Sequence, residues 1–211
     1  MATFGELQSA LQTDLHRSDT DFVVRARQAI VNAIRHYRAK GFTWNEKRVE
    51  MEVSLGVEYV SLSSDYVAME RVTLYDGADR YPLYRVTDDE IEERHRDVSD
   101  TGLPVWYAMT GKHELRLHPP TDATYSLQTV YLYDLPEITA SASDAATNAW
   151  LDEGYELVKL HAMVELAVEY IHGEEMAAAA ARWKQMELDV YRQLQSRTGR
   201  AQSSGRIAPH L

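Results

Sequence analysis

The sequence predicts an α+β protein: a discontinuous helical bundle with an inserted, mostly antiparallel β-sheet unit and an extended C-terminal tail. Apolar residues recur at helical spacing near the start of the chain and again after residue 149, and between these blocks the period changes to two. After Asp189 the chain has no acid, and residues 195–211 have few large apolar side chains, so this end cannot bury enough surface to fold alone. We therefore expect four parts, at 1–46, 47–136, 137–194 and 195–211.

Two helices are expected in the first part. The first is short and begins near Phe4, and the second begins near Asp19, where Ser18 or Asp19 can cap it, and is ended by Gly41. The apolar stripe of the second helix comprises Phe22, Ala26, Ala29, Ile30, Ala33, Ile34 and Tyr37. Its opposite face is basic, which favours a solvated surface or, alternatively, a subunit interface: Arg25, Arg27, Arg35, His36 and Arg38.

The second part alternates apolar and polar residues, as half-buried strands do. Strands are expected near 47–55, 57–62, 70–75, 80–84, 104–109, 113–117 and 125–133. Pro82 places its strand at a sheet edge, because proline cannot donate a ladder hydrogen bond. Thr87 and Glu90 form a capping box for a short helix, which we place on the surface because Ile91 is its one strongly apolar residue.

The third part opens with a linker of small residues, 137–147. A helix over Trp150–Ile171 is apolar on most sides, which predicts a central place in the bundle. Gly173 interrupts it, and a partner helix follows over Glu174–Leu194.

Composition excludes several classes of protein. The 211 residues contain no cysteine, which rules out disulfides, thiolate zinc sites, iron–sulfur clusters and a cysteine nucleophile. No apolar run reaches the roughly 18 residues of a membrane span. The net charge of −11 argues against wrapping nucleic acid through phosphate neutralisation.

The charge is unevenly distributed. Four of the 22 basic residues follow the last acid, which leaves 18 basic against 33 acidic residues, or −15, over residues 1–191. The segment 195–211 can be a frayed end or an arm that orders on a partner. In the second case its anchors are Arg197, Arg200, Arg206, Ile207 and Leu211.

Catalytic patterns are missing from the sequence. Gly111-Lys112 is followed by His113 rather than Ser or Thr, so no phosphate loop is formed. His161 and Glu165 share a helix face at i, i+4, but two ligands are not a metal site, and a hydrogen-bonded contact is expected. Glu92, Glu93 and His95 are expected on a solvated face. We predict no enzyme activity, no metal and no cofactor. The thirteen tyrosines favour association, with core packing as the alternative for most of them.

The order of these features resembles the head-to-tail adaptor (connector) proteins of tailed bacteriophages. One segment, Glu58–Tyr66, has Ser63 where the family usually has proline. The other segments that carry the resemblance are Thr3–Leu7, Ala33–Tyr37, Gly102–Ala108, Leu115–Asp122, Tyr125–Leu127, Tyr131–Pro136, Asn148–Leu151 and Trp183.

The resemblance implies a structural protein of the virion neck, made in the host cytoplasm, that forms a ring of twelve copies below the portal. Such a ring joins the portal protein to the tail or nozzle protein, and genomic DNA passes through its lumen without specific binding. It also implies that the C-terminal arm docks into the portal. Two other classes stay open: a tail-associated hydrolase and a soluble protein-binding scaffold.

Overall fold

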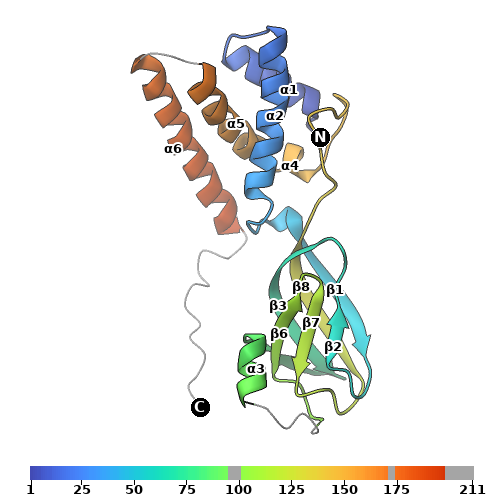
Figure 1. The fold of residues 1–211 in the computed structure, drawn as a ribbon. Helices are drawn as coiled ribbons and strands as arrows, with labels where there is room; N and C mark the ends of the chain where they lie inside the picture. The colour runs from blue at the N-terminus through green and yellow to red at the C-terminus, as the bar shows by residue number, and fades with distance from the viewer. Residues whose placement is uncertain (95–100, 171–173, 198–211) are drawn as a thin grey trace. The chain divides into compact units, whose positions relative to one another are not determined.

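The computed structural model describes residues 1–94, 101–170 and 174–197, and the chain forms two compact units (Figure 1). The first, the helical unit, comprises Met1–Asn45 and the chain from Leu135 onward, and the second, the sheet unit, comprises Glu46–Asp134. Helices and two four-stranded sheets, mostly antiparallel, confirm the predicted α+β class.

The helical unit begins with two capped helices. α1 covers Phe4–Asp14, and the Thr3 side chain accepts from the backbone N–H of Glu6 in a complete capping box. α2 covers Thr20–Tyr37, and its N-cap is Asp19, one of the two residues that the sequence allows. The remaining elements are the 3-10 helix η1 (Thr43–Asn45), α4 (Ala149–Asp152), α5 (Tyr155–Tyr170) and α6 (Glu174–Arg197).

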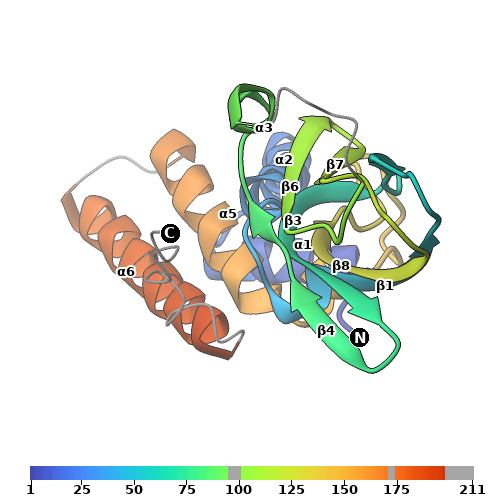
Figure 2. The same ribbon diagram turned by 90° about the horizontal axis from the view of Figure 1, so that it is seen from below.

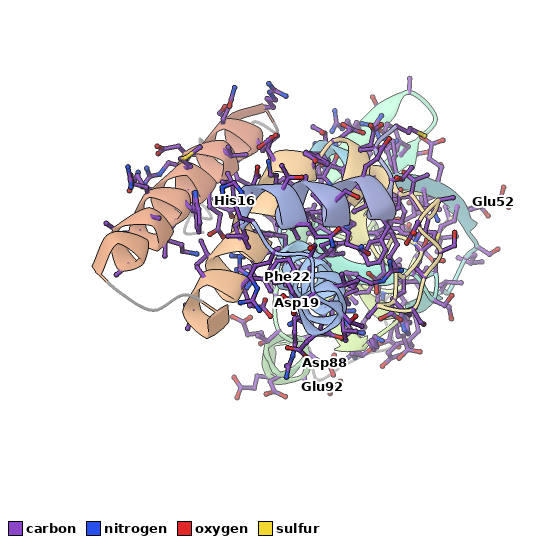
Figure 3. The ribbon with its side chains drawn as sticks, turned by 90° about the horizontal axis from the view of Figure 1, so that it is seen from above. His16, Asp19, Phe22, Glu52, Asp88 and Glu92 are labelled. Atoms are coloured by element: carbon purple, nitrogen blue, oxygen red, sulfur yellow. The ribbon has the colours of Figure 1, made fainter. Side chains whose placement is uncertain are left out.

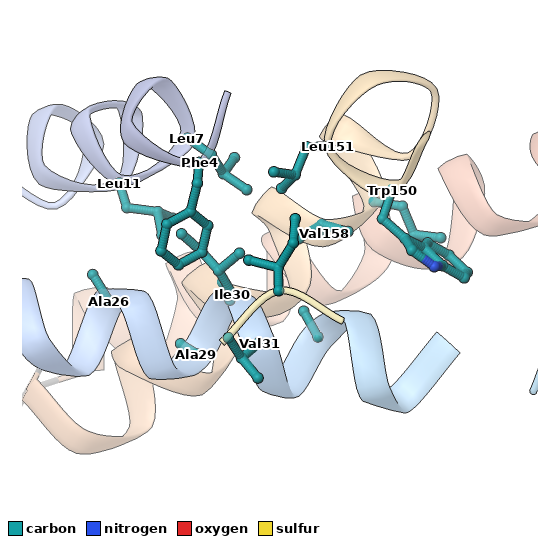
Figure 4. Packing of buried hydrophobic residues seen from close by; sticks show 14 of the residues in the cluster. Phe4, Leu7, Leu11, Ala26, Ala29, Ile30, Val31, Trp150, Leu151 and Val158 are labelled. Carbon is teal, nitrogen blue, oxygen red and sulfur yellow. The ribbon is translucent and has the colours of Figure 1, made fainter. Parts of the chain in front are cut away.

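The core of this unit is formed where α1, α2, α4 and α5 meet (Figure 4). Phe4, Leu7 and Leu11 of α1 are fully buried, and so is most of the predicted stripe of α2. α5 lies between α2 and α6 (Figure 2) and contacts α1 and α4 as well, which confirms its central place.

Three helix boundaries differ from the sequence prediction. α2 ends at Tyr37, before Gly41. The long helix expected from Trp150 is two helices, and Gly154 lies between them, so close to the Trp150 carbonyl that a Cβ there would come within 2.8 Å of its oxygen. α6 continues to Arg197, so the first three residues of the expected arm are helical. Gly173 lies outside the described residues.

The segment 137–147, which the sequence suggests is a linker, is fastened along the helical unit, and we call it the strap. The Phe4 and Gly5 amides donate to the carbonyls of Ala146 (2.8 Å) and Asp144 (2.9 Å). Ile138 is buried in the core. Gly5 permits the close approach, since a Cβ there would come within 2.7 Å of the Asp144 Cβ.

The sheet unit contains two sheets. In the first the order is β1 (Glu46–Val53), β8 (Tyr125–Tyr133), β3 (Tyr66–Asp76), β4 (Asp79–Pro82), and Pro82 does lie in an edge strand. In the second it is β2 (Tyr59–Ser61), β7 (Glu114–His118), β6 (Trp106–Gly111), β5 (Tyr84–Arg85), with β5 and β6 parallel. A second core includes Val72, Leu74, Leu115, Leu117 and Leu127.

α3 (Asp88–Arg94) contacts β6 of the second sheet. The predicted capping box is present, because the Thr87 and Glu90 side chains each accept from the other residue's backbone amide. Ile91 is 2% exposed, so the one apolar side chain of this acidic helix anchors it to the unit.

Candidate interaction sites

The predicted arm residues fall at the end of α6 and beyond it. Arg197 is the last residue of the helix and is exposed. Arg200, Arg206, Ile207 and Leu211 lie outside the described residues. Just before Arg197, the Gln195 side-chain amide donates to the Gly41 carbonyl at 2.6 Å, which fastens the last turn of α6 to the chain after α2.

A buried carboxylate joins α6 to the rest of the helical unit. Glu187 is 1% exposed. Its Oε1 accepts from the Tyr37 hydroxyl of α2 and from Nδ1 of His161 of α5, at 2.8 Å from the latter, and its Oε2 accepts from Lys184 Nζ at 2.9 Å. We call Glu187 and these three donors the Glu187 cluster. It connects three helices through one side chain.

The electrostatics of this cluster favour an ionised Glu187. Burial alone would raise the pKa of its carboxyl, but the hydrogen bonds from His161, Tyr37 and Lys184 outweigh burial and lower that pKa to about 2. Burial, with the neighbouring carboxylate, raises the pKa of Tyr37. The His36 ring stacks on His161 with centroids 4.6 Å apart, and burial together with the charge of His161 lowers the pKa of His36.

His161 and Glu165, expected as a hydrogen-bonded pair, each form a hydrogen bond with a residue of another helix. His161 reaches Glu187, and Glu165 accepts from the Asn32 side chain of α2 at 2.6 Å. Glu187 itself was not among the residues predicted from the sequence. The available signal was its helical spacing from the apolar residues Trp183, Val190 and Tyr191, which made it a charged residue within an apolar stripe.

The basic face of α2 is only partly solvated. The Arg27 guanidinium donates to the strap carbonyls of Ala140 (2.7 Å) and Ala142, and to the side chains of Gln8 and Asp144. Its carbon lies 4.5 Å from the centroid of the Phe4 ring. Arg35, in contrast, forms an exposed ion pair with Glu137 at 2.7 Å. Part of this face therefore holds the strap in place.

In the sheet unit, a buried arginine forms ion pairs with three carboxylates. The Arg116 side chain is 4% exposed and donates to Glu58 (2.6 Å), Asp88 (2.9 Å) and Glu92 (2.5 Å). Glu92, expected on a solvated face, thus takes part in an ion pair, while His95 lies outside the described residues. Asp88 and Glu92 lie on the same side of α3 (Figure 3). This pairing fixes the helix over β7.

Within residues 1–94, 101–170 and 174–197, no three His, Asp or Glu side chains gather in a way that could hold a metal ion. Among the helices in those same ranges, none combines the length and apolarity that a membrane span requires.

The whole chain has the sequence pattern of one family. The model of the SU10 adaptor protein family matches residues 2–209, which takes in both units and the segment beyond α6. No curated protein matches the chain. A match of this extent settles the relationship: the chain belongs to the SU10 adaptor protein family and is a phage head-to-tail adaptor, a structural protein that binds other virion proteins.

Proposed function

We propose that this adaptor forms a ring, of twelve copies, in the virion neck, where it joins the portal protein to the tail or nozzle protein and lets genomic DNA pass through its lumen. The observation that carries the proposal is the family match over residues 2–209. The charge pattern supports it as well, with an acidic body and an end that has only basic charges after Asp189.

We assign the contact with the portal to the arm. Its anchors are Arg197, Arg200, Arg206, Ile207 and Leu211, which offer cations for an acidic groove and apolar side chains for a hydrophobic one. A segment that orders only on binding suits a partner added late in assembly, because its ordering cost is met by the new contacts.

The direct test measures binding of the purified portal ring to three forms of the chain. One ends at Arg197, which keeps α6 and its Gln195 contact intact. A second is full-length with Arg200, Arg206, Ile207 and Leu211 replaced by serine. The matched control is full-length with Gln202, Ser203 and Ser204 replaced by alanine. We expect binding to fall at least about tenfold for the first two and to stay unchanged for the control. Full binding by the folded truncated chain would refute the role of the arm.

The ring itself is tested by light scattering and negative-stain microscopy, with and without the portal ring. We expect a closed ring at least in the presence of the portal. A chain that is monomeric alone is compatible with assembly on the partner, whereas a chain that binds no portal contradicts the proposal.

The acid excess supports passage of DNA without retention. Acids that face a lumen repel phosphates, so the duplex slides without sticking. β1 shows how acids alternate along one strand, with Glu46, Glu50 and Glu52 all exposed (Glu52 is labelled in Figure 3). A gel-shift titration of assembled rings against duplex DNA at about 50 mM salt checks this, and tight binding would count against it.

A further inference from the structure

We propose that α6 is a releasable helix, and that the Glu187 cluster is the latch that sets how often it opens from the helical unit. The inference goes beyond the proposed function, because it concerns a motion of the isolated chain that the family relationship does not imply. The interface between α6 and the rest of the helical unit is unusual. Among the described side chains of α6, from Ala177 to Arg197, Glu187 alone is buried.

The apolar contacts of α6 are incomplete. Trp183, Val190, Tyr191 and Leu194 pack against the core but are only partly buried. Met186 stays 53% exposed. An open hollow of about 460 Å³ lies beside the helix, lined by Trp183 and Met186 together with residues of α1 and α5. Because hydrophobic stabilisation scales with the apolar area removed from water, these partly buried side chains hold α6 less firmly than fully buried ones would.

The rest of the unit has a core of its own. The largest fully buried side chains there belong to α1, α2, α4 and the loop after α2, among them Phe4, Phe22, Phe42 and Trp150. Of these, Phe42 also meets Tyr191 of α6, with ring centroids 6.0 Å apart, while Phe4, Phe22 and Trp150 lie in the cluster formed by the other helices. Opening α6 therefore leaves a compact set of helices, which is the condition for a local opening below the free energy of global unfolding.

The latch is ionic, so its strength depends on the donors around Glu187. A buried carboxylate is stable only while donors surround it, and removal of one partner leaves a charge without compensation. Glu187 has one donor on α2 (Tyr37), one on α5 (His161) and one on its own helix (Lys184). The other charged or titratable groups at this place are His36, stacked on His161, and Lys40, 5.3 Å from the ring centroids of Tyr37 and Tyr191.

Opening would expose new binding surface. It frees the apolar side of α6, including Trp183 and Tyr191, and the faces of α2 and α5 that it covers. α6 also leads directly into residue 198, so its release extends the reach of the segment that follows.

Hydrogen exchange of the full-length protein, followed by mass spectrometry near pH 7, tests the latch. In the wild-type chain we expect amides of α6 to exchange faster than those of α5. Glu187→Gln keeps the size of the side chain and removes its charge, and we expect it to raise exchange in α6 by about ten- to a hundredfold while α1, α2 and α5 stay unchanged. The matched control is Asp189→Asn, which removes an exposed carboxylate from the same helix.

Tyr37→Phe is the second variant, in case Glu187→Gln fails to fold, because it removes one donor and keeps the ring. It is expected to raise exchange in α6 by about tenfold. Equal acceleration of α5 and α6 in either variant would show that the unit opens as a whole and would overturn the proposal. So would an effect of Asp189→Asn as large as that of Glu187→Gln.

Discussion

Replacing Arg27 by methionine tests whether the strap is held by a single guanidinium. Methionine keeps an unbranched apolar side chain but removes the guanidinium, whose carbon lies 4.5 Å from the centroid of the Phe4 ring, and with it every hydrogen bond to the strap. The lost bonds are those to the carbonyls of Ala140 and Ala142 and to the side chains of Gln8 and Asp144. A hydrogen bond from a charged donor contributes about 1.5–3 kcal/mol.

The four bonds do not contribute equally. The Asp144 carboxylate is 75% exposed, so its bond to Arg27 is screened and adds little. Ala140 and Ala142 are partly buried, and water replaces their lost donors in part. We therefore expect Arg27→Met to reduce the free energy of unfolding by about 2–3 kcal/mol, most of it from the two carbonyls.

Arg35→Met is the matched control. Arg35 also connects α2 to the strap, through Glu137, but both side chains of that pair are more than half exposed. We expect it to cost at most about 0.5 kcal/mol. Urea unfolding followed by tryptophan fluorescence reports mainly on the helical unit, because three of the four tryptophans, Trp44, Trp150 and Trp183, lie in it, and Trp106→Phe removes the signal of the sheet unit. Equal losses for the two variants, or a loss below about 0.5 kcal/mol for Arg27→Met, would refute the reasoning.

Three other perturbations probe separate features. His16 has φ +52° after α1, where its N–H donates to the Thr13 carbonyl, so His16→Gly should raise stability by about 0.5–1 kcal/mol; a lower melting temperature would contradict this. The pKa of Glu187 is lowered to about 2 from an ordinary 4.5, so its contribution to stability is complete above pH 4.5 and is lost as the pH falls toward 2. Urea unfolding at several pH values should show this loss in the wild-type chain and a flatter profile in Glu187→Gln. Arg116→Met leaves three carboxylates facing one another, and we expect it to lower the free energy of unfolding by about 2–3 kcal/mol. Hydrogen exchange in β6 and β7 should then be faster, whereas Glu92→Gln, which changes an exposed partner of Arg116, should have little effect.

Elements whose residues carry a strong local pattern could be predicted from the sequence. The stripe of α2 and the cap at Asp19 depend on neighbours within a few residues, and both are present in the structure. β8 alternates Tyr125, Leu127 and Thr129 on one face, and it lies in the interior of its sheet. The same holds for the edge position of Pro82.

The strap and the Glu187 cluster could not be predicted in this way. The strap is held through its backbone carbonyls, and every residue has one, so no side chain in the sequence marks these contacts. Its run of small residues therefore predicted a linker. His161 and Glu187 are 26 residues apart, and nothing local to either one indicates the other. Likewise, Gly154, between α4 and α5, lies against the Trp44 ring from a distant part of the chain, where a Cβ would come within 3.3 Å of it.

By itself the sequence determined the α+β class, the order of the elements, the acidic body and the basic end, because periodicity, capping and charge are properties of neighbouring residues. Only the tertiary structure decided which charged groups are wholly or partly buried and paired, at Arg27, Arg116 and Glu187. The physical reason is that the free energy of a charge depends on how much water and how many partners surround it, and folding sets both.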